Sequence, residues 1–553
     1  MTTSPDNEGP GPYGARWALL VLPACFVAAV AVLGSHAGPF WMWYRLDPDY
    51  FYLLDALNLV NLTTPGHIAH PGVTVDALGA LVLWAAHLGA GADEITQAVL
   101  ARPETHLRLI GALFIGLNAA ALLALGAAGH AVFGNLLAAL ILQMGPFLSM
   151  LVLKQGFHVK PEALLIFSTL MLAVVTVVAL GPGVLQRRRM GLAAAFAVVV
   201  GFGVATKVTF APLWLLPVFL LGSWRAVGVY GALSLISFVA FTLPAIGAFA
   251  EFFEWMTRLT LASGLHGRGT ATVMDFSLYP ERVLKLFSRP VLHVVFLASV
   301  AVLVVQWRRR RRGQAVPGPE TQATARALAG VCVAQLAQIL LIAKQPNAIY
   351  ILPSLILAAL AAALLYRLLV DLRLGAGPAR RRYDGAVAAL LAVLAVAQTF
   401  AVVETDREFR AMRAAADALD NDRFAACARI YFLHASGPSF AFYLASHVTG
   451  QTFAERLGKQ TPGNDFWLEN WWQPDTVQLR DWYGPRDLGR VLDSYPCAYL
   501  RGSFGERARA YLAATAPGVA FDTSCSTGME FVYTLGVDCA GRVTGAWNRG
   551  KRQ

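Results

Sequence analysis

Long apolar segments recur along most of the chain and are separated by short polar stretches. A helix that crosses a bilayer needs about 20 largely apolar residues. Segments near this length lie at residues 17–34, 107–129, 131–150, 161–181, 190–206, 209–222, 228–249, 287–306, 327–343, 348–366 and 384–403. No small-x-small cleavage site with a soluble remainder follows the first segment, so we predict an anchoring helix and not a removed signal peptide. The pattern predicts an α-helical polytopic membrane protein with about eleven transmembrane helices.

The pattern changes in two parts of the chain. Residues 35–106 form a long loop with its own helical periodicity, which is typical of helices that lie along a membrane interface. From residue 404 onward, apolar strand-like runs alternate with helical segments. We expect helices near 404–420, 439–448 and 504–515 and strands at 428–436, 497–503 and 530–537. This alternation predicts a small α/β domain with a parallel or mixed sheet.

Composition and charge agree with this organisation and orient it. The chain is 56% hydrophobic and only 14% charged, with a mean hydropathy of +0.53, as in multispanning membrane proteins. Arginine clusters between the spans fall on one side, which the positive-inside bias makes the cytoplasm. These clusters are Arg187 to Arg189, Arg225, Arg308 to Arg312 and Arg380 to Arg382.

The topology divides the chain into a cytoplasmic tail (1–16), a transmembrane module (17–403) and an outer α/β domain (404–553). A second outer loop covers residues 250–286. The net charge of +11 then reflects orientation and contact with membrane lipids, so no nucleic-acid partner is expected.

Lysines and cysteines are distributed according to the same topology. All seven lysines fall on the predicted outer side, against the positive-inside bias. A compact ammonium suits a phosphate oxygen, although snorkelling anchors are the alternative. Four cysteines lie in the outer tail, where an oxidising compartment permits disulfides. Among the three possible pairings we favour Cys427–Cys497 with Cys525–Cys539.

The candidate chemistry resides in the polar side chains at the outer face. Asp47 and Asp49 flank Pro48 just beyond the first span, where a charge near hydrocarbon is costly without a partner. The other polar residues of this face are Asp55, His67, His70, Lys154, His158, Lys160, Glu162, Lys207, Glu251, His266, Arg268, Lys344, Asn347 and Tyr350. A carboxylate can accept a hydroxyl proton while ammonium groups stabilise departing negative charge. The set favours a substrate with a phosphate leaving group and a hydroxyl nucleophile.

Several short motifs, in this order and on this face, resemble a known family. They are Asp47-Pro48-Asp49, His70-Pro71-Gly72, Pro161-Glu162, Thr206-Lys207 and the segment from Lys344 to Tyr350-Ile-Leu-Pro353. Over residues 15–370 the chain is similar to the lipid-linked-sugar glycosyltransferases of the GT-C class. The most similar group is the bacterial dolichyl-phosphate-mannose-mannosyltransferase-like proteins, which include lipopolysaccharide core and aminoarabinose transferases. The resemblance implies inverting sugar transfer from a polyprenyl-phosphate donor to a lipid, glycan or protein, at the periplasmic side of a bacterial inner membrane.

The resemblance also implies roles for individual residues. Asp49, followed by aromatic residues, matches the acidic residue that activates or orients the acceptor, and Asp47 is the next candidate. Glu162 matches a second acidic position. The expected residues near the donor phosphate are Lys207, Lys344, Lys154, His266, Arg268 and Tyr350. His70 and His158 are expected to contact substrate.

Some alternatives stay open at this point. The Asp-x-Asp spacing of Asp47 and Asp49 is closer to metal-using members of the class, so Mg²⁺ or Mn²⁺ could bind there, although metal-free relatives are common. Asp47 could cap the following helix, and Glu162 favours a helix dipole whatever its function. Trp467, Trp471 and Trp472 fit a membrane-interface belt or a core better than sugar stacking. A flippase or transporter of a lipid-linked saccharide, or a non-catalytic glycan-binding protein, would share the membrane architecture.

Overall fold

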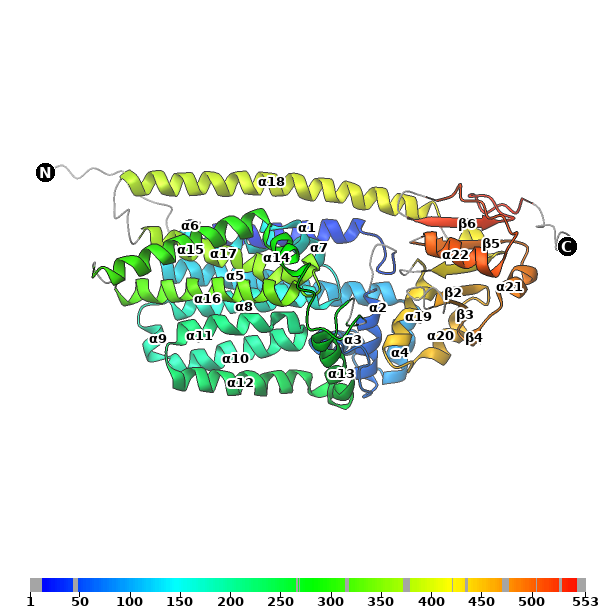
Figure 1. Ribbon diagram of the computed structural model, residues 1–553, viewed down its shortest axis with the longest axis horizontal. Helices are drawn as coiled ribbons and strands as arrows, with labels where there is room; N and C mark the ends of the chain where they lie inside the picture. Colours follow the sequence, from blue (N-terminus) through cyan, green and yellow to red (C-terminus); the bar gives the residue numbers. More distant parts are fainter. Residues whose placement is uncertain are drawn as a thin grey trace. The chain divides into compact units, whose positions relative to one another are not determined.

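A computed structural model (Figure 1) describes residues 12–42, 48–264, 267, 269–313, 318–370, 378–419, 421–432, 436–469, 477–503, 505–526 and 530–544. It divides into two compact units, which are described separately. The first unit comprises Met1–Gly34, Ile68–Leu78 and Ile110–Thr405, and the second comprises Ser35–His67, Gly79–Leu109 and Asp406–Gln553. The first outer loop is therefore shared between the units, and most of it groups with the C-terminal region.

Transmembrane-length helices dominate the first unit. Within the described ranges, nine helical segments are long and apolar enough to cross a membrane. They contain α1 (Pro12–His36), α5 (Pro103–Phe133), α8 (Pro161–Ala179), α10 (Arg189–Thr206), α12 (Trp224–Thr242), α15 (Pro290–Arg311), α16 (Pro319–Ile342), α17 (Leu352–Leu369) and α18 (Pro378–Asp417). The predicted polytopic membrane fold is confirmed. α18 continues without a break through the predicted span at 384–403 and the predicted helix at 404–420.

Two of the eleven predicted spans form shorter pieces. Residues 131–150 contain the end of α5, then α6 (Leu136–Gln143), η1 (Gly145–Leu148) and the start of α7 (Met150–Gln155). Residues 209–222 form η2 (Val208–Trp214) and α11 (Leu215–Leu221). Pro146 lies in the first turn of η1, and Pro212 lies inside η2. Proline has no backbone N–H to donate, and both prolines lie in 3-10 segments that interrupt the α-helical path.

Small residues and buried amides hold the helices of this unit together. Figure 1 shows α8, α10, α12, α16 and α17 running side by side. A Cβ atom on Gly201 of α10 would lie 2.4 Å from Ser237 of α12, so the two backbones approach closely only because of the glycine. Gln143 of α6 donates to the carbonyl oxygens of Leu19 (2.9 Å) and Leu122 (3.1 Å), which joins α6 to α1 and α5.

Shorter helices connect these spans. The unit also contains α9 (Val184–Arg187), η3 (Leu243–Ala248), α13 (Phe249–Leu261), α14 (Tyr279–Phe287) and η5 (Ala348–Ile351). α13 and α14 belong to the second outer loop of the sequence prediction.

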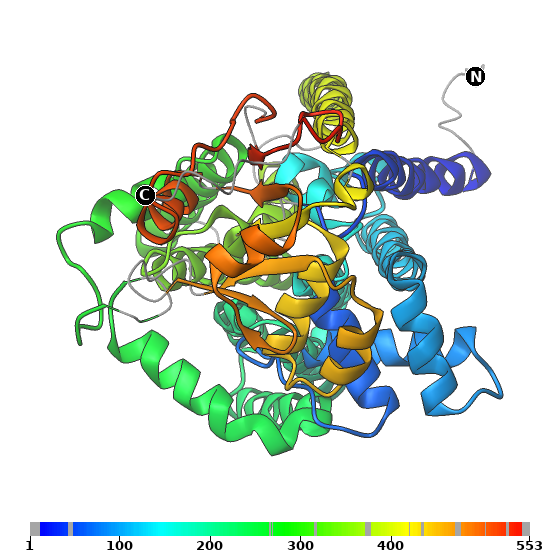
Figure 2. The ribbon, with the colours of Figure 1, turned by 90° about the vertical axis from the view of Figure 1, so that its right-hand side faces the viewer.

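A six-stranded mixed sheet forms the centre of the second unit, with its strands toward the viewer in Figure 2. The strand order is β4-β3-β2-β1-β5-β6. The central strand β1 runs parallel to β2 and β5, and the remaining neighbours are antiparallel. The strands are β1 (Ala428–Phe432), β2 (Asp465–Glu469), β3 (Gln478–Asp481), β4 (Gly484–Pro485), β5 (Ala498–Gly502) and β6 (Phe531–Leu535).

Helices cover the sheet on both faces, together with helices of the first outer loop. The second unit contains η7 (Asn421–Phe424), α19 (Pro438–Val448), α20 (Ala454–Gln460), α21 (Leu488–Ser494), α22 (Gly505–Thr515), α2 (Tyr50–Val60) and α4 (Ala92–Ala101). α3 (Val73–Ala86) passes from the first unit into the second. Trp467 of β2 is fully buried against Phe440 and Tyr443, so it belongs to the core. Trp471 and Trp472 lie outside the described residues.

Both expected disulfides are present, Cys427–Cys497 and Cys525–Cys539. The register explains the first one, because Ala428 of β1 is paired with Ala498 of β5 and each cysteine immediately precedes one of these residues.

Candidate functional site

An extended segment of the first outer loop is fixed to the end of α10 in the first unit. Pro71 forms an antiparallel bridge with Lys207, and Val208 N–H donates to the His70 carbonyl over 2.9 Å. Gly72 N–H donates to the Thr206 carbonyl over 3.3 Å. Gly72 has a φ of +77°, in the left-handed region that favours glycine, and the chain turns there into α3. The His-Pro-Gly motif therefore builds one wall around Lys207.

Lys207 and Glu162 form a buried ion pair beside this segment. The Lys207 Nζ lies 2.5 Å from Glu162 Oε1, and the two side chains are only 8% and 5% exposed. The same ammonium lies 4.7 Å from the centre of the Tyr350 ring. Four predicted site residues from separate parts of the sequence thus meet at one place: His70 through its carbonyl, Glu162, Lys207 and Tyr350.

The ends of two helices favour the charges of this pair. Glu162 lies in the first turn of α8, directly after Pro161, and Lys207 is the residue that ends α10. A carboxylate is stabilised at the positive N-terminus of a helix and an ammonium at the negative C-terminus. A lysine ammonium carries three N–H donors, so it can hold a carboxylate and a second anionic oxygen together. The arrangement is suited to binding a phosphate.

Other predicted residues of the first unit have different surroundings. Lys344 donates from Nζ to the Thr260 carbonyl of α13 over 2.5 Å, and partial burial lowers the pKa of its ammonium. Arg282 of α14 donates to the Lys344 carbonyl over 3.2 Å. Lys344 therefore fastens the second outer loop to the bundle. His266 and Arg268, which belong to the same loop, lie outside the described residues.

Two further candidates of this unit lie at the end of α7 and just after it. Lys154 is half-buried in the last turn of α7. His158 is buried, and its ring stacks on Phe157 with centroids 4.5 Å apart. Binding of the donor phosphate by Lys154 and of substrate by His158 stays a prediction.

In the second unit, Asp49 is the member of the aspartate pair that the structure describes, since Asp47 lies outside the described residues. Asp49 occupies the N-cap position of α2 and is fully buried, but its side chain makes no capping hydrogen bond. A catalytic role for Asp49 stays a prediction.

The neighbouring carboxylate Glu104 was not identified from the sequence. It accepts hydrogen bonds from the Tyr50 hydroxyl (3.0 Å) and from Phe40 N–H (3.0 and 2.9 Å to its two oxygens). Burial raises the pKa of Tyr50 well above its usual range, and the Glu104 and Asp49 carboxylates raise it further. Tyr50 therefore stays a neutral hydrogen-bond donor beside Asp49.

Asp55 secures the loop that follows α2. Its carboxylate accepts from Gly66 N–H (2.8 Å), His67 N–H (2.9 Å) and the Asn58 side chain (3.0 Å). Burial raises the pKa of Asp55 to about 6, and these hydrogen bonds offset part of that effect. The His67 ring packs edge-on against Phe51, which agrees with a loop-stabilising role.

Metal binding at Asp47 and Asp49 stays a prediction. In the described part of the chain, no group of three or more histidine, cysteine, aspartate or glutamate side chains is placed to hold an ion.

Comparisons with known proteins gave one structural match. A scan against family models found no match, and neither did a search of curated proteins. Among solved structures, the crystal structure of ArnT from Cupriavidus metallidurans bound to undecaprenyl phosphate matches with a TM-score of 0.45 and 14% sequence identity. The match covers 92% of this chain and 97% of that chain.

Proposed function

We propose that this protein is a membrane glycosyltransferase that moves a sugar from a polyprenyl-phosphate donor to a hydroxyl acceptor at the outer face of a bacterial inner membrane. The supporting observation is the buried Glu162–Lys207 pair between the ends of two spans, enclosed by the His70–Pro71 segment and the Tyr350 ring. A buried ion pair is a weak source of stability. A cation fixed beside a membrane is, however, well placed to meet the phosphate of a lipid.

The chemistry assigned to these residues is an inverting displacement at the anomeric carbon. The acceptor hydroxyl gives its proton to a carboxylate, a role for which Asp49 is the candidate from the sequence resemblance alone, and forms a new bond to that carbon. The bond from the anomeric carbon to the phosphate oxygen breaks, and its electron pair leaves with the polyprenyl phosphate. Lys207 stabilises the charge that develops on the phosphate, while Glu162 and Tyr350 hold the ammonium in position.

The direct test is a transfer assay with the purified full-length protein in lipid nanodiscs. A panel of radiolabelled polyprenyl-phosphate sugars is incubated with a membrane extract, and incorporation of label into lipid, glycan and protein fractions is measured. Lys207→Ala should reduce transfer by about 100-fold or more, the size of effect seen when one preorganised charge-stabilising group is lost. Asp49→Asn should abolish transfer while the protein still folds.

Lys285→Ala provides the matched control. Lys285 is an exposed lysine in the last turn of α14, on the same predicted outer side. The Lys285→Ala variant should transfer sugar at the parental rate. Parental transfer by both Lys207→Ala and Asp49→Asn would show that the assigned residues are wrong. Movement of a labelled lipid-linked saccharide across the bilayer without transfer to any acceptor would instead favour a flippase.

A further inference from the structure

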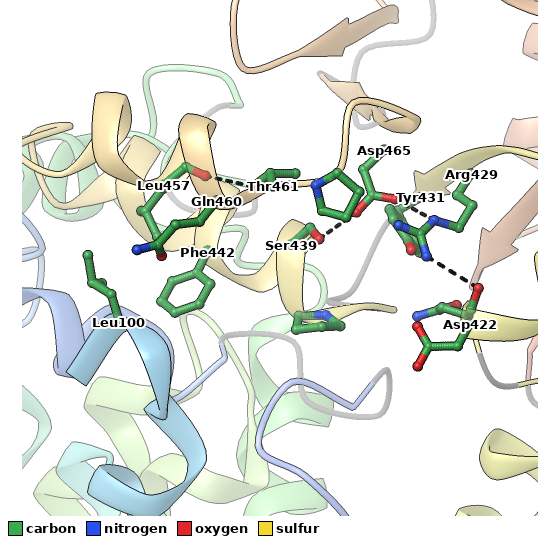
Figure 3. A pocket seen from close by; sticks show the side chains of 13 residues that line it. Leu100, Asp422, Arg429, Tyr431, Ser439, Phe442, Leu457, Gln460, Thr461 and Asp465 are labelled. Atoms are coloured by element: carbon green, nitrogen blue, oxygen red, sulfur yellow. Dashed lines mark hydrogen bonds and ion pairs between the residues drawn. The ribbon is translucent and has the colours of Figure 1, made fainter. Parts of the chain in front are cut away.

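A cavity of about 290 Å³ lies in the second unit, next to the central strands of the sheet (Figure 3). A buried ion pair forms one end of it. Arg429 of β1 and Asp465 of β2 lie on neighbouring parallel strands, with Arg429 Nε 2.6 Å from Asp465 Oδ1. Ser439 of α19 donates to the other carboxylate oxygen over 2.5 Å, and Arg429 Nη1 donates to the Asn421 carbonyl over 3.3 Å.

The opposite end of the cavity is lined mainly by apolar side chains. Figure 3 shows Phe442, Leu100 and Leu457 there, across from the Arg429–Asp465 pair. Phe442 comes from α19, Leu457 from α20 and Leu100 from α4 of the first outer loop. The side chain of Gln460 adds an amide at this end. The cavity therefore combines an aromatic and aliphatic wall with a hydrogen-bonding wall.

The buried pair is a poor device for stability alone. Removing two charges from water costs several kcal/mol per ion, and apolar residues of similar volume are often as stabilising. Arg429 and Asp465 are only 6% and 2% exposed, yet both line the cavity. The pair fixes a carboxylate and a guanidinium at the cavity wall with defined orientation.

We propose that this cavity binds one neutral pyranose ring of a saccharide. A pyranose has hydroxyl groups that both donate and accept, which suits a carboxylate beside a guanidinium, and it has C–H faces that pack on an aromatic ring such as Phe442. Small-molecule pockets begin at about 300 Å³, so this cavity has room for roughly one ring. The proposal goes beyond the transfer reaction and does not require it.

The charge of the lining favours a neutral sugar over an anion. Asp422 and Asp465 both line the cavity, whereas Arg429 is the only cation among its lining residues. The Arg429 guanidinium is already engaged by the Asp465 carboxylate and the Asn421 carbonyl, so a phosphate or a uronic acid would have to displace these partners to pair with it. The cavity is therefore chemically unlike the phosphate-binding arrangement proposed at Lys207.

Saturation-transfer NMR on the full-length protein in nanodiscs tests this directly. The probes are methyl α-D-mannopyranoside, methyl α-D-glucopyranoside and methyl α-D-galactopyranoside, with methyl β-D-glucuronide as the anionic comparison. At least one neutral glycoside should show saturation transfer and bind more tightly than the glucuronide. Ser439→Ala and Gln460→Ala should each weaken that binding by about fivefold, the usual effect of one lost hydrogen bond.

Two matched controls keep the result specific. Ser494→Ala removes a hydroxyl that donates to the Arg490 carbonyl of its own helix. Lys459→Ala changes the neighbour of Gln460 in the sequence, a lysine that pairs with Glu455. Both should bind like the parent. Because Gln460 is exposed, its variant should fold even if Ser439→Ala does not.

The proposal is overturned if no neutral glycoside shows saturation transfer, if the glucuronide binds best, or if Gln460→Ala and a folded Ser439→Ala bind as well as the controls. Glu162→Gln separates this site from the transfer reaction, because it should lose transfer and keep glycoside binding. Glycoside binding in a parent that transfers no sugar would leave the cavity assignment intact and remove the proposed function alone.

Discussion

Substitutions at the buried Glu162–Lys207 pair can separate its contribution to folding from its contribution to chemistry. Glu162→Gln leaves the Lys207 ammonium without its carboxylate, and Lys207→Met leaves Glu162 without its cation. Combining the two changes removes both charges and keeps the approximate volume of each side chain. We expect the double variant to recover the stability that each single variant loses, but not the transfer activity.

The magnitude follows from the burial of the two side chains. At 8% and 5% exposure, the atoms are almost completely removed from water, so solvent screening is small. Removing one partner of such a pair costs about 3–5 kcal/mol, because an uncompensated charge remains buried. Replacing both partners is often neutral or even stabilising. The double variant should therefore unfold near the parental temperature, with both single variants clearly below it.

Thermal unfolding in nanodiscs, followed by tryptophan fluorescence, measures stability, and the radiolabel transfer assay measures activity. The four proteins form a double-mutant cycle in both measurements. A double variant that regains parental stability and transfers sugar at the parental rate would refute the reasoning, because the pair would then be purely structural. Single variants as stable as the parent would refute the burial argument.

Three further predictions concern other parts of the molecule. Tyr350→Leu should raise the donor KM by about 2- to 30-fold, as expected for loss of a cation–π contact with Lys207, whereas Tyr350→Phe should keep the parental KM in the transfer assay. Replacing Cys427 and Cys497 by alanine should lower the unfolding free energy by about 4 kcal/mol, since the bond joins residues 70 apart, and non-reducing gel mobility with thermal unfolding checks this. Asp55 has a folded pKa of about 6 against an ordinary value of 3.8, so its favourable contribution is complete below pH 3.8 and is lost as pH rises through 6. The free energy of unfolding of Asp55→Asn, relative to that of the parent, should therefore rise by up to about 3 kcal/mol between about pH 4 and pH 7. Unfolding temperatures of both proteins across this pH range check the prediction.

The membrane fold could be predicted because length and hydrophobicity alone determine whether a helix can cross a bilayer. The errors arose where local chemistry changes the helix type. Pro146 and Pro212 lie within apolar runs that read as continuous spans, but these runs contain the 3-10 segments η1 and η2, in which the prolines cannot donate a backbone N–H. Hydropathy does not register such a break, because proline barely alters the mean over a long window.

The sheet was only partly predictable. β1, β5 and β6 were expected from their apolar runs, whereas β3 and β4 have only four and two residues, and β4 consists of a glycine and a proline. Short strands at a sheet edge contain little periodicity to detect. The association of the first outer loop with the C-terminal region could not be predicted from the sequence either. It depends on contacts such as Asn58 to the Thr449 carbonyl (2.9 Å), which joins residues 391 positions apart.

At the candidate site, local sequence patterns identify candidate residues more reliably than they identify the role of each residue. Pro161-Glu162 opens α8 and Pro103-Glu104 opens α5, and both dipeptides are the same helix-start signal. The Glu162 carboxylate pairs with the Lys207 ammonium, whereas Glu104 accepts from a backbone N–H and from Tyr50. Only the contacts across the fold show that the first carboxylate pairs with the Lys207 ammonium and that the second holds the Tyr50 hydroxyl and the Phe40 backbone. A Glu104→Gln variant should therefore weaken the hydrogen bonds from Tyr50 and Phe40 and lower the unfolding temperature, because the neutral amide oxygen is a weaker acceptor than a carboxylate.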